Sequence, residues 1–482
     1  MLLPRTVLAA AMVAVCGLTA GCFTGIAAGG GTRLRVALPV SPTQSMSPRG
    51  DDGVLLTRLG IAETLVQLDA EGEPKPLLAE HWTRPSPTTW SFRLRRGVRF
   101  HDGTTLTAAH AADALNRAAA ASSVPVALKD VGLTAEAVDE LNLEVSTSVP
   151  DLALPQRLSS ANLVVLAPIA YQGDRVSPAR AGTGPFVLPD LNVANGIALA
   201  PFEGYWAGPS RLSGVDVRFV PDGANRGTAL RAGEVDVAVA LPLGGLADTV
   251  VEQVRLPRTV SLLLNTSRAP FGQPAARLAA QEAVDPAALA RGVFHGRADV
   301  ARGLFRSAPP WLITPSGASG SGLKVVLATY DDRAELPEVA STVAESLRGR
   351  GFQVEQVVRR YSQLEPDLLA GNFDAVVVSR PYVLDAGDPA AYLAGDFTCT
   401  GGFNLARLCD PVVDAAVAAA LETYDVPSRR AAAVRAQNRL LATNAVIPLV
   451  HERAFIGRSP RVDGLATDPH ERLLITRATT LR

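Results

Sequence analysis

One stretch near residue 100 decides the fold, and it consists of residues 90–103, WSFRLRRGVRFHDG. Trp90, Phe92 and Leu94 alternate with polar residues, which is typical of a half-buried strand. A helix is expected to follow at 106–121, with Thr107 as its N-terminal cap. The stretch therefore indicates a strand that leads into a helix.

Strands and helices alternate on both sides of this stretch. The patterns predict strands at 33–40, 215–220, 235–240, 259–264, 324–329, 353–358, 373–379 and 446–450, and helices at 54–68, 224–232, 336–350, 364–370 and 427–443. This alternation favours an α/β fold with a largely parallel sheet flanked by helices. A chain of 482 residues is too long for one domain, so two or three are expected.

Composition excludes several classes of function. The chain is 47% hydrophobic and 19% charged, which is typical of a folded protein. Its formal net charge is −1, and no basic excess favours nucleic acid as a partner.

The N-terminus is predicted to direct export. Arg5 precedes a short apolar run, and small residues lead to Ala20-Gly21-Cys22, so residues 1–21 are expected to form a signal peptide. Cys22 resembles the acylated cysteine of a bacterial lipobox, although Thr19 stands where leucine is usual. Ordinary cleavage near Ala27 is the alternative. Glycine-rich residues 22–32 are expected to form a flexible tether to a membrane.

Two cysteines remain beyond the export segment. Cys399 and Cys409 are ten residues apart, and an oxidising compartment favours a disulfide between them. Zinc is the competing interpretation, but two cysteines without a neighbouring histidine provide half a site at most.

The usual catalytic motifs are absent from the sequence. Six histidines are scattered without metal-ligand spacing, and there is no nucleophile elbow or phosphate-binding loop. These observations favour a binding protein over an enzyme, with no cofactor and no metal site.

An ordered series of short motifs resembles one family. The motifs lie at residues 63–66, 76–82, 90–103, 182–186, 205–206, 230–236, 264–267, 283–285 and 371–375. Together they are similar to the peptide/nickel class of ABC-transporter solute-binding proteins, and the resemblance covers roughly residues 34–465.

The resemblance implies a two-lobed periplasmic-binding-protein-like α/β fold with an extra domain and a hinge between the lobes. Lobe I is expected to join residues 33–65, 172–262 and 451–482. The extra domain is expected at 66–171 and lobe II at 263–450. The chain crossings near Asn265 and Val450 are expected to form the hinge. His101 and Asp102 are expected to be structural.

The resemblance also suggests ligand residues. Asp385, four residues before Pro389, has the spacing of the aspartate that pairs with a peptide's α-amino group, although an ordinary turn is the alternative. Tyr382 follows Pro381 where the family usually has a Gly-Trp pair, and it is expected to wall the pocket. Arg333 resembles by position the arginine that binds a peptide carboxylate, with pairing to neighbouring aspartates as the alternative. Cys399 and Cys409 resemble a disulfide-closed loop of some dipeptide-binding relatives.

The expected function is therefore capture of a solute outside the cytoplasmic membrane. We expect a monomer, lipid-anchored through Cys22, that delivers short peptides or related amino-bearing solutes to an ABC permease and ATPase. The same fold carrying a nickel chelate, haem, metallophore or oligosaccharide is one alternative. A non-transport lipoprotein or an extracytoplasmic enzyme is the other.

Overall fold

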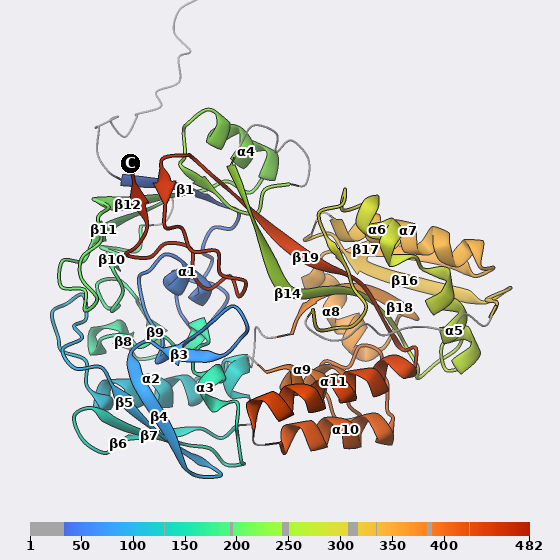
Figure 1. Ribbon diagram of the computed structural model, residues 1–482, viewed down its shortest axis with the longest axis horizontal. Coiled ribbons are helices and arrows are strands. Elements are labelled where there is room, and N and C mark those ends of the chain that lie inside the picture. Colours follow the sequence, from blue (N-terminus) through green and yellow to red (C-terminus); the bar gives the residue numbers. More distant parts are fainter. Residues whose placement is uncertain are drawn as a thin grey trace, which may run out of the picture.

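The structure is a computed structural model, and it describes residues 33–129, 131–192, 196–242, 250–306, 317–333, 335–382, 388–423 and 425–482. The predicted signal peptide, the tether with Cys22, and Asp385 lie outside these residues. The described chain forms two bodies that lie side by side, and two long strands, β14 (Val250–Leu264) and β19 (Val446–Arg458), run from one to the other (Figure 1).

An eleven-stranded sheet extends through both bodies, in the order β10-β11-β12-β1-β13-β19-β14-β18-β16-β17, with β15 paired to β19. Its other strands are β1 (Arg33–Leu38), β10 (Phe186–Val187), β11 (Ile197–Pro201), β12 (Gly214–Phe219), β13 (Val237–Ala238), β15 (Asp299–Val300), β16 (Lys324–Tyr330), β17 (Gln353–Arg359) and β18 (Ala375–Pro381). Strand β1 pairs in parallel with β12 and β13, and β16 with β17 and β18. All pairs made by β14 and β19 are antiparallel. The prediction of a largely parallel sheet was wrong, because β14 and β19, the strands that join the two bodies, are antiparallel to each other and to their other neighbours.

A smaller sheet carries the stretch that opened the sequence analysis. It has the order β4-β5-β7-β6, formed by β4 (Ala79–Ser86), β5 (Thr89–Leu94), β6 (Thr134–Ala137) and β7 (Asn142–Ser146). Phe92 and Leu94 of β5 are fully buried, as their alternation predicted. Helix α2 (Ala108–Ala119) packs on β6 and β7, and the hydroxyl of Thr107 accepts the backbone N–H of His110 at its first turn.

Short elements complete the first body. They are α1 (Gly53–Arg58), α3 (Leu154–Arg157), α4 (Gly223–Arg231), the hairpin β2 (Val66–Leu68) and β3 (Pro74–Pro76), β8 (Tyr171–Gln172), β9 (Arg175–Val176), β20 (Val462–Asp463), β21 (Thr480–Leu481) and three single 3₁₀ turns, η1 (Val126–Leu128), η2 (Ala161–Leu163) and η3 (Pro168–Ala170). The expected helix at 54–68 was wrong beyond its first turns. Gly60 adopts a φ of 66°, which ends the helix, and Val66 is already in a strand. His101 is structural here, since its Nε2 lies 2.9 Å from the carbonyl oxygen of Gly184.

Helices cover the sheet in the second body. They are α5 (Pro274–Ala283), α6 (Pro286–Arg291), α7 (Glu335–Gly349), α8 (Tyr361–Ala370), α9 (Pro389–Phe397), α10 (Pro411–Leu421) and α11 (Val426–Ala442). Helix α7 buries Leu336, Val339, Val343 and Leu347, which recur every three or four residues and so share one face. No helix in the described part of the chain is long and apolar enough to cross a membrane.

Each body has its own large hydrophobic core. Val254 and Leu256 of β14 belong to the first core, whereas Val260, Leu262, Leu263 and Leu264 of the same strand belong to the second. On β19, Val450 belongs to the second core and Ile456 to the first. The chain therefore passes between cores at 257–259 and 451–455, with a register irregularity between Arg255 and Thr259. On β14 the crossing was expected near Asn265, and it lies a few residues earlier in the chain.

Candidate ligand-binding site

A cavity of about 600 Å³ lies where β14 and β19 pass between the two cores. We call it the crossing cavity. It is lined by Ala70, Gln253, Val254, Arg255, Leu256, Pro257, Arg306, Tyr382, Arg453, Thr467 and Pro469. Both bodies contribute: Ala70 and Thr467 come from the first, and Tyr382 follows β18 of the second. A cavity between two bodies is a common place for a small-molecule site.

Three arginines of the crossing cavity converge on one carboxylate. Arg306 and Arg453 both donate hydrogen bonds to Asp299, and Arg453 also donates to Oε1 of Gln253 at 2.9 Å. The Nε of Arg255 lies 3.9 Å from Oδ2 of Asp299. Among the described residues that line the cavity, none is acidic.

Strand register explains why these charges meet. Arg453 and Arg255 are directly opposite on the antiparallel strands β19 and β14. Asp299, on the short strand β15, is opposite His451, two residues before Arg453 and on the same face of β19. Two like charges directly opposite each other destabilise a sheet, and Asp299 offsets part of that repulsion.

The ionisation of the cluster follows from these contacts. Partial burial raises the pKa of Asp299, but the hydrogen bond from Arg453 and the charge of Arg306 outweigh it and hold the pKa below its usual range. Burial, with a smaller contribution from the charge of Arg306, lowers the pKa of His451 to about 4. At neutral pH Asp299 is therefore ionised and His451 uncharged.

Arg333 lies with a second carboxylate, Glu452, whose side chain is on the opposite side of β19 from Arg453. Arg333 Nη2 donates to Oε1 of Glu452 and its Nε to Oε1 of Glu335, both at 2.8 Å. Arg258 lies 3.7 Å from Glu452, and Ser379 donates to it at 2.5 Å. The guanidinium of Arg333 is thus engaged with two acids, and a ligand role for it stays a prediction.

Tyr382 is the one predicted ligand residue that lines the crossing cavity. Its backbone N–H donates to the carbonyl oxygen of Pro257 at 3.0 Å, and its ring packs edge-on against Phe305. Burial raises the pKa of Tyr382, so its hydroxyl remains a hydrogen-bond donor at neutral pH. Asp385 lies outside the described residues, and its role stays a prediction.

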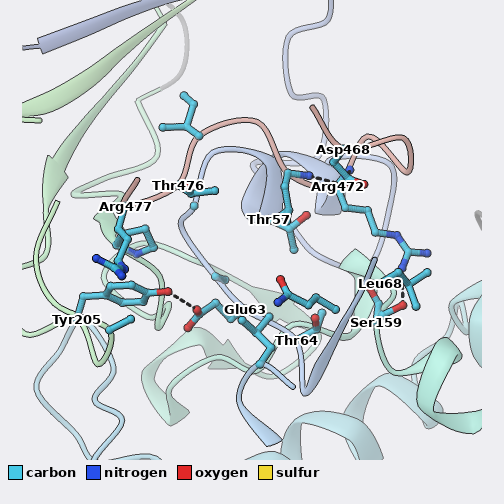
Figure 2. A pocket seen from close by; sticks show the side chains of 18 of the residues that line it. Thr57, Glu63, Thr64, Leu68, Ser159, Tyr205, Asp468, Arg472, Thr476 and Arg477 are labelled. Atoms are coloured by element: carbon cyan, nitrogen blue, oxygen red, sulfur yellow. Dashed lines mark hydrogen bonds between the residues drawn. The ribbon is translucent and has the colours of Figure 1, made fainter. Parts of the chain in front are cut away.

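A second cavity, of about 410 Å³, lies entirely within the first body, and we call it the first-core pocket (Figure 2). It is lined by residues of several separate segments that include Thr57, Glu63, Thr64, Leu68, Ser159, Tyr205, Trp206, Asp468, His470, Arg472 and Arg477. In Figure 2 the hydroxyl of Tyr205 points at Glu63, and it donates to Oε1 at 2.8 Å.

Glu63 is the most perturbed acid of this pocket. Trp206 Nε1 donates to both its oxygens, at 3.2 and 3.1 Å, and the guanidinium of Arg95 lies over the Trp206 ring at 4.1 Å. Burial raises the pKa of Glu63 to about 7, although these hydrogen bonds and the charge of Arg95 lower it. The carboxylate of Glu63 therefore has its hydrogen-bond partners within the protein, whereas Nδ1 of His470, on the same wall, is buried without a partner among the described residues.

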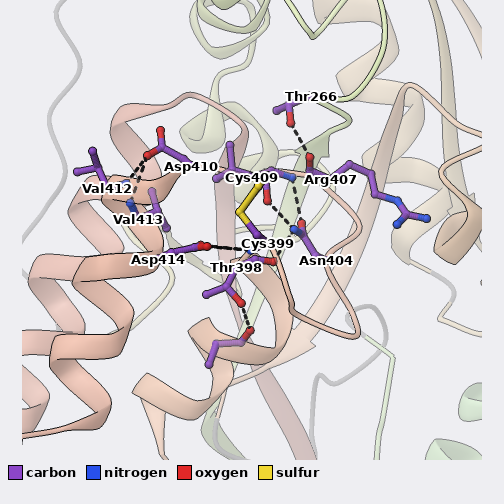
Figure 3. Close-up of a disulfide and its surroundings, with 12 residues drawn as sticks. Thr266, Thr398, Cys399, Asn404, Arg407, Cys409, Asp410, Val412, Val413 and Asp414 are labelled. Atoms are coloured by element: carbon purple, nitrogen blue, oxygen red, sulfur yellow. Dashed lines mark hydrogen bonds between the residues drawn. A yellow bond between two sulfur atoms is a disulfide. The ribbon is translucent and has the colours of Figure 1, made fainter.

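The structure joins Cys399 to Cys409 in a disulfide, which was the first of the two interpretations (Figure 3). Asn404 fixes the loop between them, since its side-chain amide donates to the carbonyl oxygens of Thr398 and Leu408. No group of three or more potential metal ligands gathers among the described residues.

The sequence reasoning missed Arg255, Asp299, Arg306 and Arg453. One signal was present for Arg453, because the apolar strand at 446–450 continues as His451-Glu452-Arg453. Charges at the end of an otherwise apolar strand indicate a site at that edge of the core. The others come from separate segments, and only the folded register brings them together.

The fold, with two cores joined by two strands and a cavity at the crossing, defines a two-lobed solute-binding protein. Residues 73–404 match the model of the bacterial extracellular solute-binding proteins, family 5. The chain belongs to this family, and it is therefore an extracytoplasmic solute-binding subunit of an ABC importer.

The individual relatives are distant in sequence, but the matched region covers most of the length of each protein. The nickel-binding protein NikA of Staphylococcus aureus is 23% identical over 424 residues, which are 83% of this chain and 84% of NikA. The glutathione-binding protein GsiB of Pectobacterium atrosepticum is 25% identical over 418 residues, 79% of this chain and 80% of GsiB. The solved structure of DppA from Helicobacter pylori in complex with the peptide STSA is similar in fold, with a TM-score of 0.76, 20% identity, and coverage of 93% of this chain and 98% of DppA.

Proposed function

We propose that this chain captures its solute in the crossing cavity and delivers it to the membrane permease. The observation that carries the proposal is the composition of the cavity wall. Residues from both bodies face one space beside the two strands that join them. A solute bound there would contact both bodies and so favour their closed arrangement.

We propose that residues 33–65, 172–262 and 451–482 form lobe I, that 66–171 form the extra domain, and that 263–450 form lobe II. Contacts across the crossing support closure between the lobes. Arg430 of α11 donates to the carbonyl oxygen of Glu71 and contacts the carboxylate of Glu73, each at 2.7 Å. These contacts join lobe II to the turn of the β2–β3 hairpin.

We propose short peptides or related amino-bearing solutes as the cargo. The peptide complex of the Helicobacter protein and the glutathione-binding relatives support this class. Asp385 is proposed to pair with the solute's amino group, Tyr382 to wall the site, and Arg333 to contact a carboxylate. A nickel chelate is the second candidate, supported by the nickel-binding relative.

The membrane attachment is a proposal from the sequence. We propose that residues 1–21 are removed as a signal peptide and that Cys22 is acylated, which keeps the monomeric binder close to its permease and raises the effective solute concentration there. We also propose that the protein binds its cargo without chemical transformation.

Solute identity is tested by mass spectrometry of the small molecules released from wild-type protein after gentle purification from membranes. The site is tested by Ala70→Trp, which places an indole in the crossing cavity. Retained solute should fall by tenfold or more, whereas Ala109→Trp, on an exposed position of α2, should retain it fully. Equal retention in both variants would place the solute elsewhere.

Thermal denaturation gives an independent measure. A ligand at 100 times its dissociation constant stabilises the folded state by about 2.7 kcal/mol. The released solute should therefore raise the Tm of wild-type protein but leave the Tm of the Ala70→Trp variant nearly unchanged.

A further inference from the structure

The arginines of the crossing cavity carry more charge than the protein neutralises. Arg255, Arg306 and Arg453 contribute three positive charges, and the carboxylate they share, Asp299, contributes one negative charge. The same carboxylate has only two oxygens to accept hydrogen bonds, so it cannot satisfy three guanidinium groups, each with five N–H donors.

The other described acids near the cavity are engaged elsewhere or exposed. Glu471 lies 3.9 Å from both Arg58 and Arg258, and Glu452 pairs with Arg333. The carboxylate of Asp468 accepts the backbone N–H groups of His470, Arg472 and Leu473. Glu73 pairs with Arg430. Glu71, beside Ala70, is exposed to solvent. Among the described residues, at least one positive charge at the cavity thus remains without a carboxylate partner.

The geometry of Arg255 and Arg306 also indicates positive groups that lack a full set of partners among the described residues. Arg255 has its nearest carboxylate oxygen 3.9 Å away, beyond a hydrogen bond, and its side chain is 70% exposed. The Nε of Arg306 is buried without a hydrogen-bond partner among the described residues. A buried donor without an acceptor costs free energy, and a ligand acceptor would recover it.

The sheet itself holds the cluster in place. Since Arg255 and Arg453 are directly opposite each other on β14 and β19, their repulsion is present in the empty protein. An anion between them would convert that repulsion into two attractions. Both strands belong to the central sheet, so their pairing sets the backbone positions of the two arginines relative to each other before a ligand binds.

We infer that the crossing cavity selects solutes with an oxyanion, a carboxylate or a phosphate group, which is bound by Arg255, Arg306 and Arg453. This inference rests on the proposed function, because it takes the crossing cavity as the solute site. It narrows the cargo to molecules in which acidic groups outnumber basic ones. The Tyr382 hydroxyl, on the same wall, supplies a further donor to such a group.

The test uses probes of matched size and different charge. Wild-type protein is titrated by calorimetry with Ala-Glu, Ala-Gln and Ala-Lys, with tricarballylate and its triamide, and with inorganic phosphate. Ala-Glu should bind at least about tenfold more tightly than Ala-Gln and Ala-Lys, and tricarballylate more tightly than its triamide, and 0.5 M NaCl should weaken the binding of both acids. Phosphate binding stronger than that of tricarballylate would assign the site to phosphate groups, and the reverse order would assign it to carboxylates.

Two substitutions at the cluster should act in opposite directions. Arg255→Gln removes a donor to the oxyanion and should weaken the acidic probes by about tenfold to hundredfold. Asp299→Asn removes the negative charge that competes with the oxyanion and should strengthen them by about threefold to tenfold. Arg255 is exposed, so its replacement should leave the fold intact even if the Asp299 variant is destabilised.

Arg291→Gln is the matched control. Arg291 is 72% exposed and lies 3.9 Å from Asp285, nearly the same exposure and pairing distance as Arg255, but it does not line the crossing cavity. Its variant should bind every probe as the wild type does.

Two results would overturn the inference in different ways. If Ala-Gln or Ala-Lys binds as tightly as Ala-Glu, the preference for solutes in which acidic groups outnumber basic ones is wrong while the crossing cavity remains the solute site. If no probe binds, or if Arg255→Gln and Arg291→Gln behave alike, the inference is also wrong, and retention of solute by the wild type and Ala70→Trp proteins decides the proposed function separately.

Discussion

The two cavities of this protein differ in how their charges are satisfied. In the first-core pocket, Glu63 is fully buried and accepts hydrogen bonds from Tyr205 and Trp206 of the same body. In the crossing cavity, Asp299 is shared by three arginines, and residues of both bodies form the wall. A buried carboxylate that has its hydrogen-bond donors within the protein needs no ligand, whereas a surplus of positive charge beside a cavity suits an anionic one.

The largest expected difference between the two regions is in pH dependence. Burial raises the folded-state pKa of Glu63 to about 7, from about 4.5 for an unperturbed side chain. The folded state therefore holds a proton that the unfolded state has lost between those values, so the contribution of Glu63 is full below pH 4.5 and declines as pH rises toward 7. At 1.36 kcal/mol per pH unit, the decline reaches about 3 kcal/mol.

This prediction is checked by urea unfolding of wild-type protein and of the Glu63→Gln variant between pH 4.5 and 7.5. The wild type should lose stability relative to the variant as pH rises. Asp299 behaves oppositely, because its pKa is lowered in the folded state, so its contribution is lost only as pH falls through and below its usual range. A constant difference between wild type and Glu63→Gln would show that Glu63 stays ionised throughout.

The fold was predictable because several local signals agreed. The cap at Thr107 predicted the start of α2, and the alternation of Phe92 and Leu94 with polar residues predicted β5. Helix α7 lies within one residue of its predicted bounds. The direction of β14 and β19 was not predictable, since a strand–helix succession favours parallel pairs and says nothing of two strands that return along each other.

The site was less predictable for a physical reason. Tyr382, which lines the crossing cavity, was predicted through the resemblance, whereas the position of the arginines there depends on cross-strand register. Arg255 and Arg453 become neighbours only when β14 and β19 pair, and Asp299 reaches them through a two-residue strand. Register of this kind is set by the packing of both cores and is not encoded in the sequence near any one of these residues.

A smaller effect on stability should distinguish Arg333, which pairs with Glu452, from Arg255, which lines the crossing cavity. Arg333→Gln removes a partner of the buried carboxylate of Glu452, while Arg258 and Ser379 remain. Loss of one partner from a buried pair is strongly destabilising, but the remaining contacts should limit the loss to about 2 kcal/mol. Arg255→Gln should change the free energy of unfolding by no more than about 0.5 kcal/mol, because Arg255 is exposed.

Urea unfolding without solute, followed by calorimetry with the released solute, checks both variants. Arg333→Gln should lower stability, and Arg255→Gln should lower affinity. If Arg333→Gln leaves stability unchanged and abolishes binding, Arg333 is a ligand residue, as the family resemblance implies, and its contacts with Glu452 are incidental.

The smallest expected effect concerns closure, which should involve the crossing cavity and not the first-core pocket. Arg430 contacts Glu71 and Glu73 across the bodies, and its side chain is 42% exposed. Exposed ion pairs contribute up to about 1 kcal/mol, so Arg430→Gln should weaken solute binding by about fivefold at most and lower the free energy of unfolding by no more than about 1 kcal/mol. Arg359→Gln breaks an exposed pair with Asp367 within the second body and serves as the control, with unchanged affinity.

Small-angle scattering of the solute-free protein should show a larger radius of gyration for Arg430→Gln than for Arg359→Gln, since only the contact of Arg430 joins the two bodies. Equal radii and equal affinities would mean that the contact of Arg430 with the β2–β3 turn does not stabilise the closed arrangement, and closure would then depend on the solute alone.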